Sequence, residues 1–275
     1  MDLVICLPTY NEASNLPAMH AALRRTVPTA FLVVIDDASP DGTGAVADSL
    51  ADDDPRLCVL HRPGKYGLGK AYLAAFRWLL AGSAPNEDFT VYPHGLILDS
   101  PPPLILQMDA DFSHPVACVP AMHEAASEAD LVIGSRNVAG GGIARWGRGR
   151  RLLSRWGSAY ARFWTGMPVR DCTAGFKLWR RDLLAEVIAY PIASNGYAFQ
   201  IETSFLAWRL GGRIREMPII FADRAAGQSK MSIRIALEAA LLVPRLRWRY
   251  RCIVGRRARV FQPQTKTFAI DEGRI

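Results

Sequence analysis

The sequence predicts an α/β fold in which helices cover both faces of a mostly parallel sheet. Short apolar runs rich in Val, Ile and Leu alternate with segments of helical periodicity through the first half of the chain. The runs are continuously apolar, as in strands buried on both faces, and acidic residues follow several of them directly. The 275 residues, 50% hydrophobic and 21% charged, can bury such a core, which excludes collagen, coiled coils and wholesale disorder.

Five strands and four helices are expected in strict alternation in the first half of the chain. Each apolar run is followed by a segment with apolar residues at helical spacing. The expected strands are residues 3–7, 31–35, 57–61, 104–108 and 131–135, and the expected helices are 12–25, 43–50, 68–80 and 116–127. Ligands of such sheets collect at the carboxyl ends of the strands, so the residues that follow each strand matter most.

Two segments interrupt this alternation. Residues 81–103 contain several Pro and show no clear period, so we expect an insertion loop of about 20 residues. A Gly-rich basic loop over residues 140–149 is followed by a helix with Arg151, Arg155 and Arg162. No Ser- or Pro-rich linker separates a second domain. The sequence therefore predicts one domain over residues 1–235 and a basic C-terminal extension over residues 236–275.

The net charge of +7 is unevenly distributed along the chain. Residues 1–135 hold 7 Lys and Arg against 17 Asp and Glu, whereas residues 136–275 hold 26 against 9. Residues 245–259 alone contain seven arginines and no acid. Such a balance suits nucleic acid, an anionic membrane or a phosphorylated ligand, and the total charge does not choose between them.

The beginning of this arginine-rich segment also contains aromatic residues. Helical periodicity runs through Ile233, Leu237 and Leu241, and Pro244 is expected to stop or kink the helix. Basic and apolar residues then alternate: Arg245, Leu246, Arg247, Trp248, Arg249, Tyr250 and Arg251. Arginine beside Trp and Tyr suits the headgroup layer of an anionic bilayer. The alternative is a helix that packs on its own domain and has a solvated basic edge.

The cysteines and the N-terminus indicate an intracellular protein. The cysteines form an odd set without a CxxC pair, which favours reduced thiols: Cys6, Cys58, Cys118, Cys172 and Cys252. The N-terminal sequence MDLVICLPTYNE lacks the basic start of a signal peptide. The apolar stretch at residues 239–244 is far shorter than the roughly 20 residues of a membrane span. We therefore expect a protein that meets a membrane only at its surface.

Acidic residues follow two of the expected strands. Asp109 and Asp111 flank one small residue after the strand at 104–108, and Asp36 and Asp37 end the strand at 31–35. In an extended segment, alternate side chains project the same way, so two carboxylates can approach one divalent ion. A solvated strand end with an Asx turn is the alternative for an isolated pair. Two such pairs at the ligand edge favour Mg²⁺ or Mn²⁺ carrying substrate phosphates.

Two further polar segments precede expected helices. We expect Asp41 to cap the helix at 43–50, which leaves Asp37 to bind a ribose or a base. Residues 67–70, Gly-Leu-Gly-Lys, superficially resemble a phosphate loop. Their spacing matches neither of the standard nucleotide-binding fingerprints, so a helix N-terminus is the preferred interpretation.

Eight segments in the same order resemble the family-2 glycosyltransferases, and within them the polyprenol-phosphate (dolichol-phosphate) mannosyltransferases. The resemblance covers residues 3–235 and is more specific than any single motif. The matching segments are LPTYNE (7–12), IDDASPDGT (35–43), GLGKAY (67–72), MDADFSHP (108–115), DLVIGSR (130–136), VRDCTAGFKLWRR (169–181), GYAFQIE (196–202) and DRAAGQSKMS (223–232).

The resemblance implies a GT-A fold and assigns residues to a sugar-nucleotide site. The positions that resemble the base pocket are Pro8, Tyr10, Glu12, Ile35 and Asp37. The positions that resemble the diphosphate and metal segment are Asp109, Ala110 and Asp111, with Ser113 as a third metal ligand. The basic positions that resemble contacts to donor and acceptor phosphates are Arg136, Arg224 and Lys230. Asp111 and Arg136 are the two residues expected to act in catalysis.

The reaction that the resemblance implies is transfer of mannose from GDP-mannose to a polyprenyl or dolichyl-type monophosphate, with inversion and with Mg²⁺ or Mn²⁺. A metal and fixed cations can neutralise the leaving diphosphate, and the anionic acceptor needs no strong general base. Glucosyl transfer from UDP-glucose is an alternative, and a catalytically silent scaffold protein is another. Nucleic-acid binding, a different class, leaves Asp37, Asp109 and Asp111 without a role, so we expect no nucleic-acid partner.

Several residues near these segments are secondary candidates. Lys177 lies in the strand-like run AGFKLW and either faces the cleft or reaches solvent. Gln200 and Glu202 are expected to open a helix, where an acid also compensates the helix dipole. Asp171 and Thr173 either line the acceptor site or form a tight turn. We expect the protein to work peripherally on the cytoplasmic face of a membrane, alone or with a separate anchor subunit.

Overall fold

The computed structural model describes residues 2–81, 89–94, 96, 100–144, 148–222, 233–253 and 260–261. The five expected strands are confirmed as β1 (Leu3–Thr9), β2 (Phe31–Asp36), β3 (Leu57–His61), β5 (Leu104–Gln107) and β6 (Leu131–Ser135). The four expected helices are confirmed as α1 (Leu16–Thr26), α2 (Thr43–Asp53), α3 (Leu68–Ala81) and α4 (Val119–Ala125), with a 3-10 turn at Val116–Cys118 before α4. The described strands form a nine-stranded sheet and a small two-stranded one.

The large sheet is mostly parallel, as the sequence predicts. Its order is β11-β9-β6-β8-β5-β1-β2-β3-β4. Only β8 (Lys177–Arg180), between β5 and β6, and β4 (Thr90–Tyr92), beside β3, pair antiparallel with their neighbours. The strands β9 (Ile214–Pro218) and β11 (Val260–Phe261) extend the sheet beyond β6. The small parallel sheet pairs β7 (Gly142–Ile143) with β10 (Ile220–Phe221).

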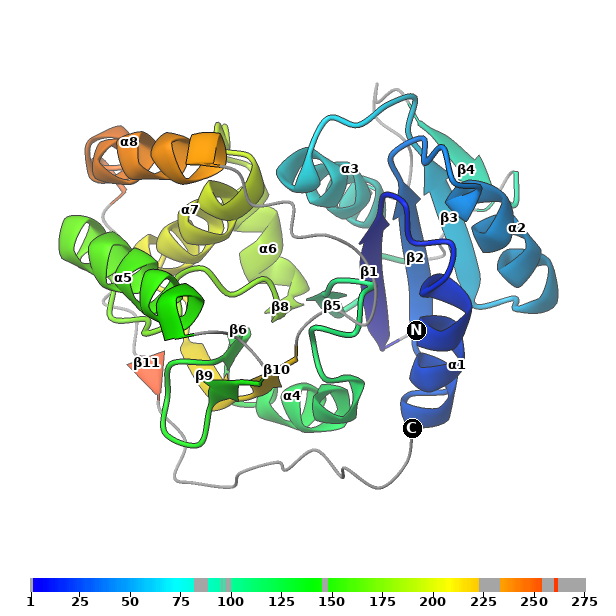
Figure 1. Cartoon of the computed structure of the whole chain (residues 1–275), viewed down its shortest axis with the longest axis horizontal. Coiled ribbons are helices and arrows are strands. Elements are labelled where there is room, and N and C mark those ends of the chain that lie inside the picture. The colour runs from blue at the N-terminus through cyan, green and yellow to red at the C-terminus, as the bar shows by residue number, and fades with distance from the viewer. Residues whose placement is uncertain are drawn as a thin grey trace.

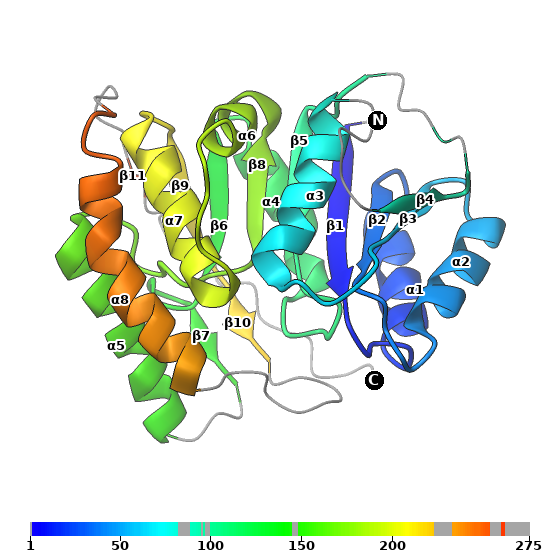
Figure 2. The same cartoon turned by 90° about the horizontal axis from the view of Figure 1, so that it is seen from above.

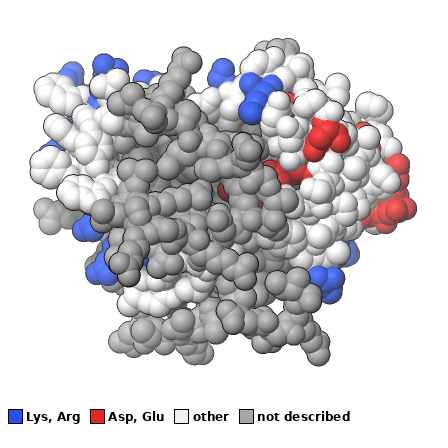
Figure 3. All heavy atoms as spheres, in the orientation of Figure 1, with Lys and Arg blue, Asp and Glu red and all other residues white. Residues whose placement is uncertain are grey.

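Helices cover both faces of the sheet, and each face has its own apolar core. One core joins the sheet to α1, α2 and α4. The other joins it to α3, α6 (Arg181–Ile188) and α7 (Gly196–Arg209), and reaches α5 (Arg148–Thr165) and α8 (Ile233–Arg249). Figures 1 and 2 show α5 and α8 side by side at the end of the sheet opposite α1 and α2. In Figure 3 the visible acidic side chains lie on the right half, over the first part of the chain.

Two expected boundaries are wrong, because distant contacts decide them. The first helix begins at Leu16 instead of residue 12. Asn11 has a φ of 60°, and the carbonyl of Glu12 accepts hydrogen bonds from the amides of Asn15 and Leu16, so a turn precedes the helix. Part of the expected loop at 81–103 is the strand β4, which adds to the edge of β3.

Pro244 neither stops α8 nor leaves an unpaired carbonyl behind. A proline has no N–H to donate to the carbonyl four residues earlier, which here belongs to Ala240. Tyr160 of α5 donates its hydroxyl to that carbonyl at 2.7 Å, so α5 supplies the hydrogen bond that α8 lacks. The expected boundary between residues 235 and 236 falls inside α8, and the division into two units stays a prediction.

All five cysteines are free thiols, and all except the exposed Cys252 are buried. Within the described segments, no helix combines the length and apolar character needed to cross a membrane.

Candidate active site

The carboxyl ends of β1, β2 and β5 lie side by side at one edge of the sheet, with Thr9 opposite Asp36. A non-glycine residue with positive φ follows each of the three strands: Asn11 at 60°, Ala38 at 53° and Phe112 at 61°. No other non-glycine residue in the described segments has a positive φ. Strained backbone of this kind collects at functional sites, so these three turns mark the edge where a ligand is expected.

An acid and a base form a buried pair after β2. The Arg62 guanidinium donates to Asp37 Oδ1, and the two side chains are 7% and 8% exposed. Burial raises the pKa of Asp37, while the charge of Arg62 opposes that rise. After β1, Lys65 Nζ lies 3.7 Å from the centroid of the Tyr10 ring. Asp37 and Tyr10, both predicted for the base pocket, therefore each lie next to a cation.

The other three residues predicted for the base pocket differ in their surroundings. The Glu12 amide donates to Thr43 Oγ1 at 2.9 Å, and its carboxylate accepts from Asn15 Nδ2 at 2.7 Å. Pro8 is partly exposed at the end of β1. The Ile35 side chain is fully buried in the core that includes α3, so any contact with a donor would come from its backbone.

Two helix starts agree with the sequence analysis. Asp41 Oδ1 accepts from the Thr43 amide, the first of α2, at 3.1 Å, although the N-cap position itself belongs to Gly42, which has a φ of 87°. The helix α3 begins after Gly67, which has a φ of 98°, and the Gly69 amide donates to Asn195 Oδ1 at 2.9 Å. The Gly-Leu-Gly-Lys segment therefore forms a helix N-terminus, as expected, and the side chain of Asn195 accepts from one of its amides.

The segment after β5 carries the residues predicted to hold a metal. Asp111 Oδ1 accepts from the Ser113 amide at 3.1 Å, and both side chains are nearly inaccessible to solvent. Burial raises the pKa of the Tyr72 hydroxyl, and the charges of the Asp109 and Asp111 carboxylates raise it further. Ala110, between the two acids, is buried.

His114 fixes the backbone of this segment, a role that the sequence analysis missed. Its Nδ1 accepts from the Asp109 amide at 2.9 Å, and its ring stacks on Phe176 with centroids 5.0 Å apart. Burial lowers the pKa of His114 in spite of the two nearby carboxylates, which favours the neutral ring that such a hydrogen bond requires. A His five residues after Asp109 in the segment MDADFSHP was the available signal.

Arg136 is fixed at the end of β6 by a bidentate ion pair. Its Nε and Nη2 each lie 2.7 Å from an oxygen of Asp171, and its amide donates to the same carboxylate at 2.9 Å. Nη2 also donates to Thr173 Oγ1 at 2.9 Å. Burial of Asp171 would raise its pKa, but the charge and hydrogen bonds of Arg136 outweigh this and lower it. Asp171 and Thr173 therefore position Arg136.

Glu216 of β9 is a second positioning acid that the sequence analysis did not identify. Its carboxylate accepts from the amides of Arg170 and Asp171 at 2.8 and 2.9 Å, and its side chain is fully buried. It thereby fixes the turn that carries Asp171, which in turn holds Arg136. The only feature of the local sequence that could have identified Glu216 was the presence of an acid within the strand sequence IREMP.

Three secondary candidates are placed differently from the expectation. Lys177 neither faces a cleft nor reaches solvent, because its Nζ is buried and donates to the Gln200 carbonyl at 2.7 Å. Gln200 accepts from Gln107 Nε2 at 2.8 Å inside the same buried network. Glu202 lies in the second turn of α7 and accepts from the Ser194 amide and from the Tyr250 hydroxyl. Arg224 and Lys230 lie outside the described residues.

A family profile described as glycosyl transferase family 2 matches residues 4–81 and 99–188. The chain belongs to this family. The match includes the three strand ends, the two acids after β5, and the Arg136–Asp171 pair. The predicted membership and the glycosyltransferase class are therefore confirmed.

Two characterised relatives of this family are similar over most of the chain. The undecaprenyl-phosphate mannosyltransferase of Micrococcus luteus is 43% identical over 245 residues, which is 89% of this chain and 93% of that protein. The polyprenol monophosphomannose synthase of Mycolicibacterium smegmatis is 39% identical over 231 residues, which is 83% of this chain and 80% of that protein.

Solved structures support the GT-A fold. Glucosyl-3-phosphoglycerate synthase from Mycobacterium tuberculosis, solved with Mn²⁺, UDP and phosphoglyceric acid, matches with a TM-score of 0.59 at 20% identity, over 90% of this chain and 78% of that one. The mannosyltransferase PcManGT from Pyrobaculum calidifontis, solved with GDP-Man and Mn²⁺, matches with a TM-score of 0.51 at 17% identity. This chain covers 58% of that protein, and the match covers 82% of this chain.

The residues of the family-2 site fit a divalent metal that is shared with substrate phosphates. Ser113 Oγ is buried and has no hydrogen-bond partner within the described part of the chain, as expected of an oxygen reserved for a ligand. The described segments contain no cluster of three or more His, Cys, Asp or Glu side chains that could hold an ion by itself. Two carboxylates and a hydroxyl suit Mg²⁺ or Mn²⁺, which take few protein ligands when substrate phosphates complete the shell.

The buried Lys177 makes stability depend on pH above neutrality. Burial lowers the pKa of its amine from 10.5 to about 7, so between these values the unfolded chain binds a proton that the folded chain does not. Stability therefore rises with pH through this range, by at most about 1.4 kcal/mol per pH unit. Urea unfolding between pH 7 and pH 8.5 should show a steeper rise for the native chain than for Lys177→Met. Equal slopes would contradict the buried, deprotonating amine.

Proposed function

We propose that the protein transfers mannose from GDP-mannose to a polyprenyl monophosphate, with inversion at the anomeric carbon. The observation that carries this proposal is the sheet edge, where Asp109, Asp111 and Ser113 follow β5 and the fixed cation Arg136 follows β6. The names of the two relatives that are 43% and 39% identical support a mannosyl donor and a polyprenyl phosphate acceptor.

The donor is proposed to lie across the ends of β1, β2 and β5. Asp37, Tyr10 and the residues around them would hold the guanosine, because an acid and an aromatic ring can contact the edges and faces of a base. Asp109, Asp111 and Ser113 would hold Mg²⁺ or Mn²⁺, which neutralises charge on the diphosphate when bound. Arg136 would contact the same leaving group or the acceptor phosphate, and Arg224 and Lys230 stay predictions as further phosphate contacts.

The proposed chemistry needs positioned charge more than proton transfer. An oxygen of the lipid phosphate attacks the anomeric carbon of mannose, and the bond from that carbon to the diphosphate breaks, which releases GDP. The acceptor is already an anion near neutral pH, so no strong general base is required. Attack opposite to the leaving group turns an α-linked donor into a β-linked product. The fixed guanidinium of Arg136 would stabilise negative charge as it develops, without reorganisation.

The acceptor also bears on where the enzyme works. A polyprenyl chain resides in a bilayer, so we propose that the protein acts peripherally on the cytoplasmic face of an anionic membrane. The arginines that begin with Arg245 support such a contact through their charge. A separate anchor subunit is a further proposed partner.

Radiolabelled sugar transfer tests the proposed function. Purified protein is incubated with GDP-mannose or UDP-glucose, a polyprenyl phosphate and Mg²⁺ or Mn²⁺, and label in the lipid phase is measured over time. We expect transfer from GDP-mannose, dependence on the metal, and little transfer from UDP-glucose. Transfer from UDP-glucose alone would change the donor, and no glycolipid from either donor would overturn the proposal.

A further inference from the structure

Two neighbouring helices, α5 and α8, expose most of the large apolar side chains on the described surface. The structure has seven exposed large hydrophobic residues in its described segments, and only Tyr66 lies elsewhere. The other six form what we call the α5–α8 face: Trp156, Tyr160, Phe163 and Trp164 on α5, and Leu241 and Trp248 on α8. Trp156, Phe163 and Trp248 are 67%, 78% and 73% exposed. Six large apolar side chains exposed on two neighbouring helices mark an interaction site.

Each of the two helices exposes apolar side chains in addition to the buried ones that pack on the rest of the protein. On α5, Ala161 and Thr165 face inward, while residues 156, 160, 163 and 164 recur at helical spacing on the outside. On α8, Val243 and Leu246 face inward, while Leu241 and Trp248 are exposed. The inner faces account for the packing of both helices. The outer faces need another partner.

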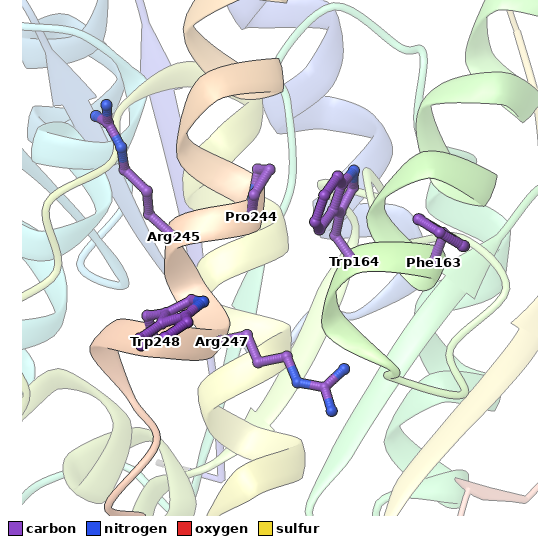
Figure 4. A pocket seen from close by; sticks show the side chains of 6 residues that line it. All are labelled: Phe163, Trp164, Pro244, Arg245, Arg247 and Trp248. Carbon is purple, nitrogen blue, oxygen red and sulfur yellow. The ribbon is translucent and has the colours of Figure 1, made fainter.

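The α5–α8 face is a fixed platform. The Tyr160 hydroxyl ties α5 to the Ala240 carbonyl at 2.7 Å, and Arg249 Nη2 ties α8 to the Pro191 carbonyl at 2.7 Å. Residues of both helices line a cavity of about 590 Å³ at this face: Phe163, Trp164, Pro244, Arg245, Arg247 and Trp248. Figure 4 shows Trp164 and Pro244 lying toward one another, with the two arginines extending away from them. Aromatic and arginine side chains therefore line the same cavity.

The charge of these helices selects an anionic partner. The sequence of α5 contains five arginines and no acid, and that of α8 contains four arginines and one acid. Two copies of the chain packed through this face would bring the arginines together, which disfavours a dimer. Trp and Phe beside Arg suit the boundary between the headgroups and the acyl chains of an anionic bilayer.

We infer that the α5–α8 face docks the protein on an anionic phospholipid bilayer, with Trp156, Phe163 and Trp248 inserted below the headgroups. This inference rests on the proposed function only for its biological purpose, which is to bring the enzyme to a lipid acceptor. It extends the contact beyond the arginines after Pro244 to α5, a helix more than 70 residues earlier in the sequence. The docking itself depends on the exposed aromatic and arginine side chains of α5 and α8, and it does not require the proposed enzymatic activity.

Binding to phospholipid vesicles tests the docking surface. The full chain is mixed with sucrose-loaded vesicles of phosphatidylcholine with about 30% phosphatidylglycerol, or of phosphatidylcholine alone, and the bound fraction is measured by sedimentation. We expect binding to the anionic vesicles with a blue shift of tryptophan emission. The triple variant Trp156→Ser/Phe163→Ser/Trp248→Ser should bind at least about tenfold more weakly, because its three inserting rings are gone. These side chains are exposed, so the variant should fold.

A matched charge pair separates this face from general attraction to a negative surface. Arg245→Gln/Arg247→Gln removes two arginines that line the cavity beside the α5–α8 face and should weaken binding to anionic vesicles by about tenfold. Arg25→Gln/Arg56→Gln removes the same charge around α1, at the other end of the sheet, and should leave binding within about twofold. Equal losses in the two double variants, or native binding by the triple serine variant, would overturn the inference. The inference would also be wrong if the native chain did not bind vesicles and instead formed a dimer through this face.

A water-soluble acceptor separates failure of the docking surface from failure of the proposed function. The triple serine variant should transfer mannose to a short-chain polyprenyl phosphate in solution at the native rate, and should lose transfer to a long-chain acceptor in vesicles. Native transfer by the variant to the long-chain acceptor would count against docking. Absence of transfer to either acceptor by both proteins would remove the proposed function and leave the vesicle result to decide docking.

Discussion

Asp111→Asn is expected to reduce mannosyl transfer by at least about 10² to 10³-fold in kcat, because removal of one fixed charge at a leaving group has effects of this size. The substitution removes a negative charge and keeps the size of the side chain. Asn Oδ1 can still accept the hydrogen bond that the Ser113 amide donates at 3.1 Å. Since the side chain is only 3% exposed, its replacement should not alter the surface of the protein.

Initial rates measured over a range of Mn²⁺ and Mg²⁺ concentrations test the loss. If Asp111 holds the metal, the variant should stay slow at every concentration, whereas Ser113→Ala should need more metal but regain most of its rate. Thermal unfolding without metal should show that Asp111→Asn is folded, because Asn keeps the size of the side chain and its hydrogen bond with the Ser113 amide.

Asp48→Asn provides the matched control for this prediction. Asp48 is also a carboxylate in the acidic first half, but it pairs with His61 at 2.7 Å and is about one-third exposed. Asp48 lies on α2, and its partner His61 ends β3, which is three strands away from β5 in the sheet, so neutralisation of Asp48 should leave kcat and the metal requirement unchanged. If Asp48→Asn lost as much activity as Asp111→Asn, or if Asp111→Asn turned over at the native rate, the metal assignment would be wrong.

Local patterns were sufficient to predict the parts of the fold that local interactions determine. Continuous apolar runs such as residues 31–35 identified the parallel strands, and the acids directly after them identified the ligand edge. The start of α1 could not be predicted in this way. It depends on a positive φ at Asn11 and on the hydroxyl of Thr43, which accepts from the Glu12 amide 31 residues away.

The site residues that were misplaced or missed have partners far away in sequence. Lys177 lies in a run that is compatible with either face of a strand, and only the packing of α7 shows that its amine is buried against Gln200. Glu216 acts on the Asp171 amide from a strand 45 residues later. Periodicity describes which face of an element is apolar, but it contains no information about which distant element covers that face.

The Arg136–Asp171 pair allows catalysis and stability to be separated. Arg136→Ala is expected to lower kcat by about 10² to 10³-fold, since a cation fixed by two 2.7 Å contacts is lost from the proposed diphosphate site. It should also lower the free energy of unfolding by about 3–5 kcal/mol, because the fully buried Asp171 loses its partner. A loss of activity in this variant alone would therefore be ambiguous.

The double variant Arg136→Ala/Asp171→Asn resolves this ambiguity. It removes both buried charges, so urea unfolding at pH 7 should show that most of the lost stability is recovered, while kcat should stay as low as in the single variant.

The pH dependence of stability gives a second check. In the native chain Arg136 holds the pKa of Asp171 below its usual value, so the stabilisation is present above about pH 4 and is lost as the pH falls through the folded pKa. In Arg136→Ala the carboxyl should instead have a raised pKa, and the destabilisation should be largest at neutral pH and should shrink in acid. Recovery of native kcat by the double variant would show that Arg136 contributes only to folding, whereas recovery of stability without activity would place its guanidinium in the transfer reaction.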